Sequence, residues 1–163
     1  MAKKQFDFKN LSYKAGEIHI ELDMSRFERQ FQQAQYYLDG AVMNSMVPYM
    51  PMITGSFVNT TRAASSAVQG SGLVYAAYAP QGRFLYEGKV MVDELTGSPW
   101  ARRGARKVLV SEYTGQTNAR ENISYTHQAH PKAQDHWFDA AKQADGKIWI
   151  KDTKRIAGGG SNG

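Results

Sequence analysis

The first part of the chain alternates between apolar and polar positions. Ile18, Ile20 and Leu22 fall on one side, and the polar residues between them fall on the other. A period of two with β-branched residues predicts a half-buried strand. An earlier strand is predicted around residues 6–8, separated from this one by a turn at 14–16.

A long helix is predicted directly after this strand, because the apolar period lengthens to between three and four. Its apolar stripe consists of Phe27, Phe31, Ala34, Leu38, Ala41 and Val42. Ser25 followed by Glu28 fits a capping box, in which the two side chains bond to backbone N–H groups of the first turn. Asp39 falls on the polar side. Pro48 marks the expected end, since proline removes a hydrogen bond and clashes with the preceding turn.

The middle of the chain predicts several short elements. A short helix or turn is expected at 55–62. Two extended runs, 63–69 and 73–78, flank a glycine-rich turn and predict a β-hairpin. One or two helical turns are expected at 81–89.

The regular spacing of apolar residues weakens over residues 90–130 and then returns. We expect a long irregular loop there, with a short strand at 108–110, and such loops are usually functional or disordered. A last helix is predicted from Pro131, and residues 158–163 are expected to form a flexible tail. The stripe of the last helix consists of Trp137, Ala140, Ala141, Ala144 and Ile148, with Lys151 at its end.

Length and composition narrow the class of protein. The chain has 163 residues, a formal charge of +5 and no cysteine. This length favours one domain, taken as residues 1–157. The absence of cysteine excludes disulfide frameworks, thiolate nucleophiles and thiolate metal sites. We expect neither a secretory signal nor a membrane span.

Charge is distributed unevenly along the chain. Residues 55–110 carry seven basic and three acidic side chains, a balance of +4. Between Asp39 and Arg83 only Arg62 is charged. A neutral tract of this length is expected to be core or to be covered by another chain.

The strongest binding signal is a basic run within the long loop. It consists of Arg102, Arg103, Arg106 and Lys107. Arginine presents a planar fork of donors to phosphate or carboxylate groups, and Trp100 and Tyr113 on either side offer stacking. The run predicts a contact with DNA or with an acidic neighbouring subunit. The plain alternative is a solvated charge run on a mobile loop.

Catalytic and metal-binding signals are weaker. His127, His130 and His136 offer imidazole ligands for zinc, but their spacing fits no compact ligand motif. Acidic residues that stand close in sequence are Glu87, Asp93 and Glu94. We interpret them as solvated loop charges. Because no serine lies in a Gly-x-Ser-x-Gly elbow either, we expect a protein that is not an enzyme and has no cofactor.

Two adjacent aromatic residues, Trp137 and Phe138, begin the last helical stripe. Neighbouring residues cannot both face the same side of a helix. One is expected in the core and the other toward a partner, where aromatic side chains are favoured.

Four short motifs follow one another along the chain. They are Pro51-Met-Ile-Thr54-Gly55-Ser56, Tyr75-Ala-Ala-Tyr78, Gly82-Arg-Phe-Leu-Tyr86-Glu87, and His130-Pro131 leading into His136-Trp137-Phe138-Asp139-Ala140-Ala141. Their order resembles that in the small minor capsid proteins of long-tailed phages, which are similar to the tail-completion or head–tail joining proteins of the neck. The resemblance covers roughly residues 25–155, and the 90–130 loop matches least. Ser56 and Phe57 depart from the family pattern, in which many relatives have a basic residue that begins a strand.

The resemblance implies an α+β fold in which two main helices pack on a small antiparallel sheet. It also implies a structural virion protein of the neck, assembled in the host cytoplasm. Such a subunit forms a homo-oligomeric ring between the portal-side connector and the tail terminator or tail tube. The basic run then docks to an acidic neighbour or lines the passage of DNA, while Trp137 and Phe138 anchor the last helix.

Two alternatives stay open beside this interpretation. The first is a free-standing DNA- or RNA-binding protein that uses residues 102–107. The second is a metal hydrolase built on the three histidines.

Overall fold

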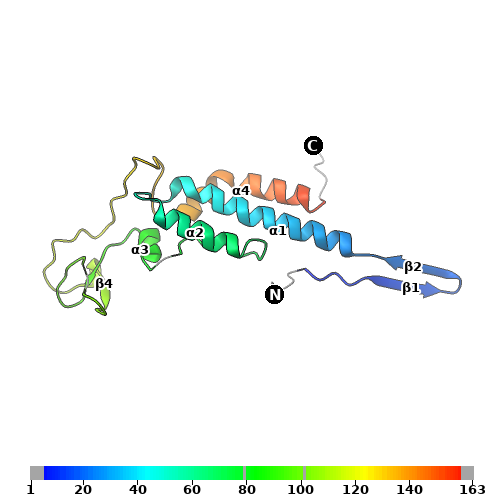
Figure 1. Ribbon diagram of the computed structural model, residues 1–163, viewed down its shortest axis with the longest axis horizontal. Helices are drawn as coiled ribbons and strands as arrows, with labels where there is room; N and C mark the ends of the chain where they lie inside the picture. Colours follow the sequence, from blue (N-terminus) through cyan, green and yellow to red (C-terminus); the bar gives the residue numbers. More distant parts are fainter. Residues whose placement is uncertain (1–5, 79, 101, 159–163) are drawn as a thin grey trace.

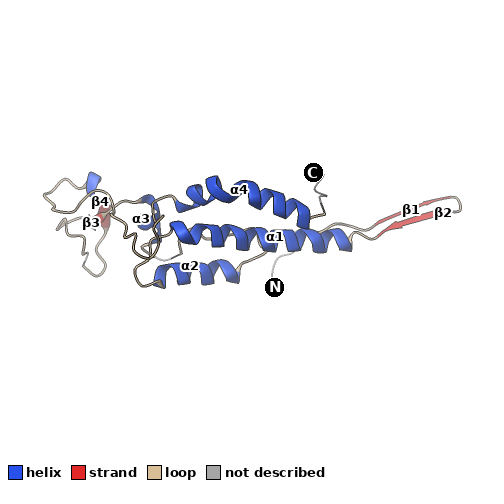
Figure 2. Cartoon of the chain, turned by 90° about the horizontal axis from the view of Figure 1, so that it is seen from above, coloured by secondary structure: helices blue, strands red, loops and turns tan. Residues whose placement is uncertain are grey.

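The computed structural model describes residues 6–78, 80–100 and 102–158. The molecule is elongated: a hairpin projects at one end, helices form the body, and a lobe of loops forms the other end (Figure 1, Figure 2). The helices are α1 (Ser25–Met46), α2 (Ser56–Ala67), α3 (Gly82–Glu87) and α4 (Trp137–Ile156), with the 3-10 turns η1 (Val47–Tyr49) and η2 (Val110–Glu112). The strands are β1 (Leu11–Ala15), β2 (Ile18–Leu22), β3 (Met91–Asp93) and β4 (Lys107–Leu109).

Helix α1 is the central element of the body. Helix α4 runs antiparallel along one side of it, and α2 lies on the other side (Figure 2). The buried side chains of this core are Met43, Met46, Met50, Val58, Trp137, Ala141 and Trp149. Flexible methionine side chains fill the irregular space around the two tryptophans, and the burial of apolar surface holds the helices together.

The α+β class expected for the chain is confirmed. The described residues form two sheets, each two-stranded and antiparallel, β1 with β2 and β3 with β4. Within this class, α1 and α4 pack against each other, and the sheets lie at opposite ends of the molecule (Figure 1). Helices and sheets are therefore arranged end to end rather than as stacked layers.

The predicted strand near the N-terminal end is confirmed as β2, which pairs with β1. Gly16 has φ +60° at the first central position of the two-residue turn, a conformation that glycine adopts without steric cost. The expected half-burial is wrong, since every residue of both strands is exposed. No strand forms at residues 6–8, where the rings of Phe6 and Phe8 pack against Phe31 of α1.

Helix α1 has bounds close to the predicted ones, but its N-terminal bonds differ. Ser25 lies in the first turn, and the capping box is absent from this end of the helix. The backbone N–H and the hydroxyl of Ser25 both donate to the Asp23 carboxylate, at 2.9 and 3.0 Å. These bonds favour the charged form and lower the pKa of Asp23. At the other end, Pro48 lies in the first turn of η1, where its missing N–H costs no hydrogen bond.

The predicted hairpin of residues 63–69 with 73–78 is wrong. Helix α2 continues through the first run to Ala67, and the second run has no strand. Three alanines in the first run favour the helix, because alanine has the highest intrinsic helix propensity.

Hydroxyl groups of α2 bond to the backbone of the irregular segment 73–78. Ser65 Oγ accepts the N–H of Tyr75 at 3.1 Å, and Thr61 Oγ1 accepts the N–H of Tyr78 at 3.2 Å. Both hydroxyl residues are buried. Their side chains thus provide the hydrogen-bond acceptors that a partner strand would provide in a hairpin. Segment 73–78 therefore covers part of the neutral tract between Asp39 and Arg83.

Helix α4 begins at Trp137, later than the predicted start at Pro131, and it buries a different stripe. Trp149 faces α1 and its indole N–H donates to Ser45 Oγ at 3.1 Å, whereas Ile148 is 55% exposed. The predicted stripe was therefore wrong beyond the first turns of the helix. The predicted helical turns at α3 and the predicted short strand at β4 are confirmed.

Two further expectations concern the membrane and the C-terminal tail. Across the described ranges, each helix is too short or too polar to cross a bilayer. The predicted tail lies outside the described residues except for Gly158, whose N–H donates to Arg155 O at 3.2 Å.

Asp39 ties α1 to the loop after α2, although the sequence placed it on the polar side of the helix. Its carboxylate is buried and accepts the backbone N–H groups of Gly70 at 2.7 Å and Gly72 at 3.0 Å. The side-chain amide of Gln35 donates to it as well, at 2.7 Å. Three donors therefore compensate for the removal of this charge from water.

We expect Asp39→Ala to lower the free energy of unfolding by about 2–3 kcal/mol, because two backbone N–H groups lose a charged acceptor. Urea denaturation followed by circular dichroism measures this change. The control is Glu112→Ala, which removes an exposed carboxylate from η2 and should cost less than about 0.5 kcal/mol. Equal effects of the two substitutions would contradict the role given to Asp39.

Candidate binding loop

The basic run lies in the lobe at the end of the molecule opposite the β1–β2 hairpin (Figure 1). Strands β3 and β4 form the base of this lobe, with Met91 opposite Leu109 and Asp93 opposite Lys107. Residues 94–106 connect the two strands and are called the basic loop below. The short ladder fixes where this loop begins and ends.

The carboxylate of Asp93 organises the first half of the basic loop. It is completely buried and accepts the backbone N–H groups of Leu95 at 2.9 Å and Thr96 at 3.2 Å. The backbone of Asp93 closes the same turn, donating to Ser98 O and accepting from Gly97 N–H, both at 2.8 Å. The interpretation of Asp93 as a solvated charge was therefore wrong, because the loop folds around it.

Arg102 closes the second half of the loop onto the same carboxylate. Its Nε donates to Asp93 Oδ2 at 3.1 Å and its Nη2 donates to Oδ1 at 3.2 Å, while its backbone N–H reaches Oδ2 at 3.3 Å. The guanidinium, with the backbone N–H of Leu95, holds the pKa of Asp93 well below its usual range. In return the carboxylate raises the pKa of Arg102. The Arg102 side chain thus braces the loop internally.

The other cations of the run differ in what they contact. Lys107 Nζ donates to Pro99 O at 3.0 Å, and Arg106 Nε lies 3.9 Å from a carboxylate oxygen of Glu94. Among the described residues, no carboxylate lies within ion-pair distance of Arg103, and its side chain is exposed. The four cations and two carboxylates of residues 93–107 leave a local charge of +2.

Apolar and cationic side chains share a hollow on the basic loop. The hollow has a volume of about 540 Å³, and its lining includes Leu95, Arg103 and Arg106. Leu95 is 71% exposed, and Trp100 on the same loop is 88% exposed. Guanidinium groups beside exposed apolar surface suit an acidic protein segment, or a phosphate that carries a group able to stack.

Three aromatic residues singled out by the sequence lie within the fold. The ring of Tyr113 lies so close to Gly97 that a Cβ there would collide with it, so Tyr113 braces the loop. Trp137 is completely buried, and Phe138 packs at the edge of the same core. The prediction that Trp137 anchors α4 to a partner is therefore wrong, because residues of its own chain surround it. Phe138 stays a candidate contact residue.

The three histidines have separate roles. His130 Nδ1 lies 2.8 Å from Met50 O and connects the segment before α4 to the residue that follows η1. His136 precedes α4 with φ +43°, and its ring packs edge-on against Tyr86. His127 is exposed. Within the ranges that the structure describes, no three histidine, aspartate or glutamate side chains come together as metal ligands.

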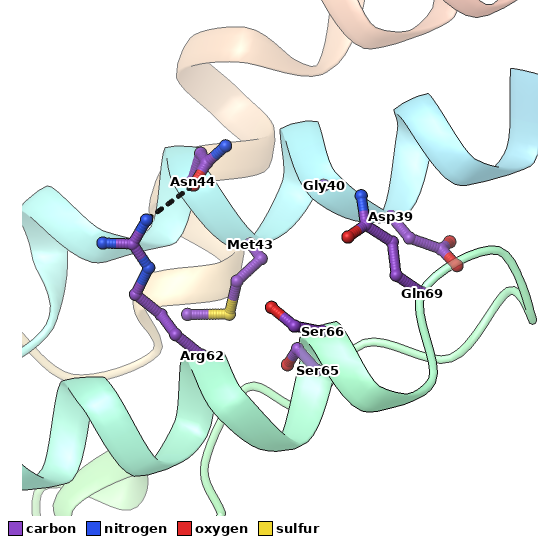
Figure 3. Close-up of a pocket in the computed structure, with 8 residues that line it drawn as sticks. All are labelled: Asp39, Gly40, Met43, Asn44, Arg62, Ser65, Ser66 and Gln69. Carbon is purple, nitrogen blue, oxygen red and sulfur yellow. Dashed lines mark hydrogen bonds between the residues drawn. The ribbon is translucent and has the colours of Figure 1, made fainter.

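A second hollow, which the sequence did not reveal, lies between α1 and α2 (Figure 3). It has a volume of about 220 Å³ and is lined by Asp39, Gly40, Met43, Asn44, Arg62, Ser65, Ser66 and Gln69. Arg62 Nη2 donates to Asn44 Oδ1 at 3.4 Å, and Gln69 Nε2 donates to Tyr36 O at 3.0 Å. Because these polar groups bond to the chain itself, the basic loop is the stronger candidate for a binding site.

The lowered pKa of Asp93 makes the basic loop sensitive to acid. A carboxyl whose pKa is lowered by folding stabilises the folded state at pH values above its ordinary pKa of 3.8. This stabilisation is lost as the pH falls from 3.8 toward the lowered pKa. We expect protection of the Leu95, Thr96 and Arg102 amides from hydrogen exchange to decline below about pH 3.8, with α1 still protected.

Substitutions test whether Asp93 causes this sensitivity. Asp93→Asn should reduce the protection of the same three amides already at neutral pH, because the ion pair with Arg102 is lost. The matched control Glu94→Gln should leave them protected, since Glu94 only approaches Arg106 at 3.9 Å. Full protection in Asp93→Asn would contradict the bracing role.

Comparison with known proteins finds no relative of this chain. No family model, no curated protein and no solved structure matches it. The geometry of the chain and the order of its sequence motifs therefore carry the functional argument.

Proposed function

We propose that this chain is a structural, non-enzymatic subunit of the virion of a long-tailed phage. In this proposal it belongs to a homo-oligomeric ring in the neck and joins the portal-side connector to the tail tube or its terminator. It is assembled in the host cytoplasm and uses no cofactor.

The observation that carries the proposal is the presence of two unlike surfaces at opposite ends of one helical body (Figure 1). The β1–β2 hairpin presents large apolar side chains, and the basic loop presents cations together with Trp100. A joining subunit contacts different components on its two sides, and an elongated body with unlike ends meets this requirement. Aromatic and arginine side chains are also the residues favoured at protein contacts.

Residues in or beside the four motifs meet at one place in the core. Trp137 donates its indole N–H to Ala76 O at 2.8 Å. The rings of Phe57 and Tyr86 pack edge-on against it, with centroids 5.8 and 4.9 Å away. The motifs therefore contribute side chains to the core of the fold and not to a reactive site. Their support for a relation to the minor capsid proteins comes from this shared role in packing.

Copy number in virions tests the neck assignment. Quantitative mass spectrometry of gradient-purified particles should recover the chain at a ratio typical of one ring, from a few copies to about a dozen. The portal and major tail proteins of the same particles provide the reference. Absence of the chain from intact, tailed particles would rule out the structural role.

Binding of DNA or RNA through the basic loop is the second candidate function. The exposure of Trp100 and Arg103 on one loop favours it, because stacking and cations together bind single strands. The local charge of +2 limits the electrostatic part of such binding.

If the basic loop binds nucleic acid, the logarithm of the association constant should fall with the logarithm of the salt concentration. The magnitude of this slope should not exceed about two. The double substitution Arg103→Ala/Arg106→Ala should remove most of that slope, and Trp100→Ala should weaken single-strand binding by about 1–3 kcal/mol. Lys151→Ala/Lys154→Ala removes equal charge from α4 and serves as the control. Fluorescence anisotropy measures these affinities, and no binding even at low salt would exclude this function.

A further inference from the structure

The β1–β2 hairpin separates its side chains completely by face. In an antiparallel ladder the residues directly opposite each other lie on the same face, and the register pairs apolar with apolar and polar with polar. The apolar face consists of Leu11, Tyr13, Ala15, Ile18, Ile20 and Leu22. The polar face consists of Ser12, Lys14, His19 and Glu21.

The apolar face is uncovered. Its five large side chains are 47–65% exposed, and the hairpin projects beyond α1 without another described element packed on it (Figure 1, Figure 2). A single two-stranded hairpin is at best marginally stable in water. We therefore expect the hairpin to bind a partner that supplies further strands or apolar surface.

The two outer edges of the hairpin provide strand-pairing groups of opposite charge. Within the described chain β1 pairs only with β2, so each strand presents backbone N–H and C=O groups along its outer side. The polar positions of β1 carry Lys14, whereas those of β2 carry Glu21. A contact of β1 with a second β2 in the register of the hairpin makes Lys14 and Glu21 diagonal neighbours, within reach of each other's charges. A contact of β1 with β1, or of β2 with β2, brings like charges together instead.

We propose that the hairpins of neighbouring copies join edge to edge, with β1 of one copy beside β2 of the next, in one continuous antiparallel sheet. Hairpins that point the same way around a common axis alternate in strand direction, so this junction is antiparallel, as it is within one hairpin. The apolar face of one copy continues into that of the next, and the flanks of Tyr13 and Ile20 cover each other. Each junction repeats the ladder pattern of the hairpin itself.

The chemistry of the hairpin favours a second copy over other occupants. Lys14 is outnumbered by Glu17 and Glu21, which disfavours nucleic acid and an anionic lipid surface. A contact between two different edges is heterologous, and repetition of such a contact gives a ring when the rotation closes. This inference adds a specific contact between the subunits of the proposed ring. It rests on the proposed function only where it assumes that the contacts close into a ring, because edge pairing itself does not require a position in the neck.

Disulfide trapping tests the pairing, and the chain is suited to it because it contains no cysteine. Ser12→Cys on β1 is mixed with Glu21→Cys or, separately, with His19→Cys on β2 in the full chain under mild oxidation. Disulfides need Cβ atoms about 4 Å apart, whereas identical residues of successive hairpins are two strands, about 9.5 Å, apart. A disulfide-linked dimer is therefore expected from a mixture and not from any variant alone. Ser66→Cys with Ser111→Cys, on α2 and η2, is the exposed control pair.

Each outcome of the trapping experiment decides the proposal. A dimer that appears only in a mixture of a β1 and a β2 variant supports it. Dimers from a single variant indicate a two-fold contact between like edges and overturn it. No dimer in any mixture, or equal trapping in the control pair, overturns it as well.

Charge reversal adds a test in which the rescue by mixing two variants depends only on contacts between copies. Lys14→Glu and Glu21→Lys each place like charges at every junction, so each variant alone should need a severalfold higher concentration to assemble. In an equimolar mixture every junction between two different variants again joins unlike charges, so the mixture should assemble at a lower concentration than either variant alone. Sedimentation velocity measures assembly, and circular dichroism checks that the helices stay folded. A mixture no better than its components would overturn the proposal.

Failure of the pairing and failure of the neck assignment give different results. Absence from virions with mixture-specific dimers would reject the neck and keep the hairpin contact. Presence in virions at a ring-like ratio without such dimers would keep the neck and place the ring contacts on other surfaces.

Discussion

The indole N–H of Trp137 donates to Ala76 O inside the core, while its ring packs against Phe57 of α2 and Tyr86 of α3. Because Trp137 is the first residue of α4, this contact positions the start of α4 against three segments that lie far from it in the sequence. A buried indole N–H needs an acceptor, so the segment 73–78 has to bring its carbonyl to that place. The course of α4 along α1, and the position of α3 beside the start of α4, both depend on this arrangement.

Two buried carboxylates order the loops that this core does not reach. Asp39 accepts backbone N–H groups from the loop after α2, and Asp93 accepts them from the basic loop together with the guanidinium of Arg102. In each case a charge is removed from water and compensated by several donors, which fixes the backbone around it. The remaining cations of the basic loop are thus attached to an ordered backbone, and this lowers the entropy that a partner must offset on binding.

Local pattern was sufficient for α1, β2, α3 and β4, because their periodicity and their proline and glycine boundaries are properties of neighbouring residues. It failed for residues 63–78, where Ser65 and Thr61 accept bonds from another segment, a relation that exists only in three dimensions. It also failed for Asp93, which is buried beside an exposed Glu94, since the return of the chain at Arg102 decides between them. The alternation at Ile18–Leu22 correctly predicted which side chains share a face, but alternation does not show whether that face is covered.

Edge strands are a hazard for any protein, since free backbone groups invite pairing with any available strand. The hairpin has two such edges and an apolar face, yet its strands are only five residues long and their edges carry unlike charges. Short edges keep a single chance encounter weak, and unlike charges favour one orientation of the incoming strand. Short strands and unlike edge charges therefore limit non-specific association and also favour the ordered addition of one hairpin to the next. Placing them on an arm away from the helical body lets copies join at one end while the basic loop at the other end stays accessible.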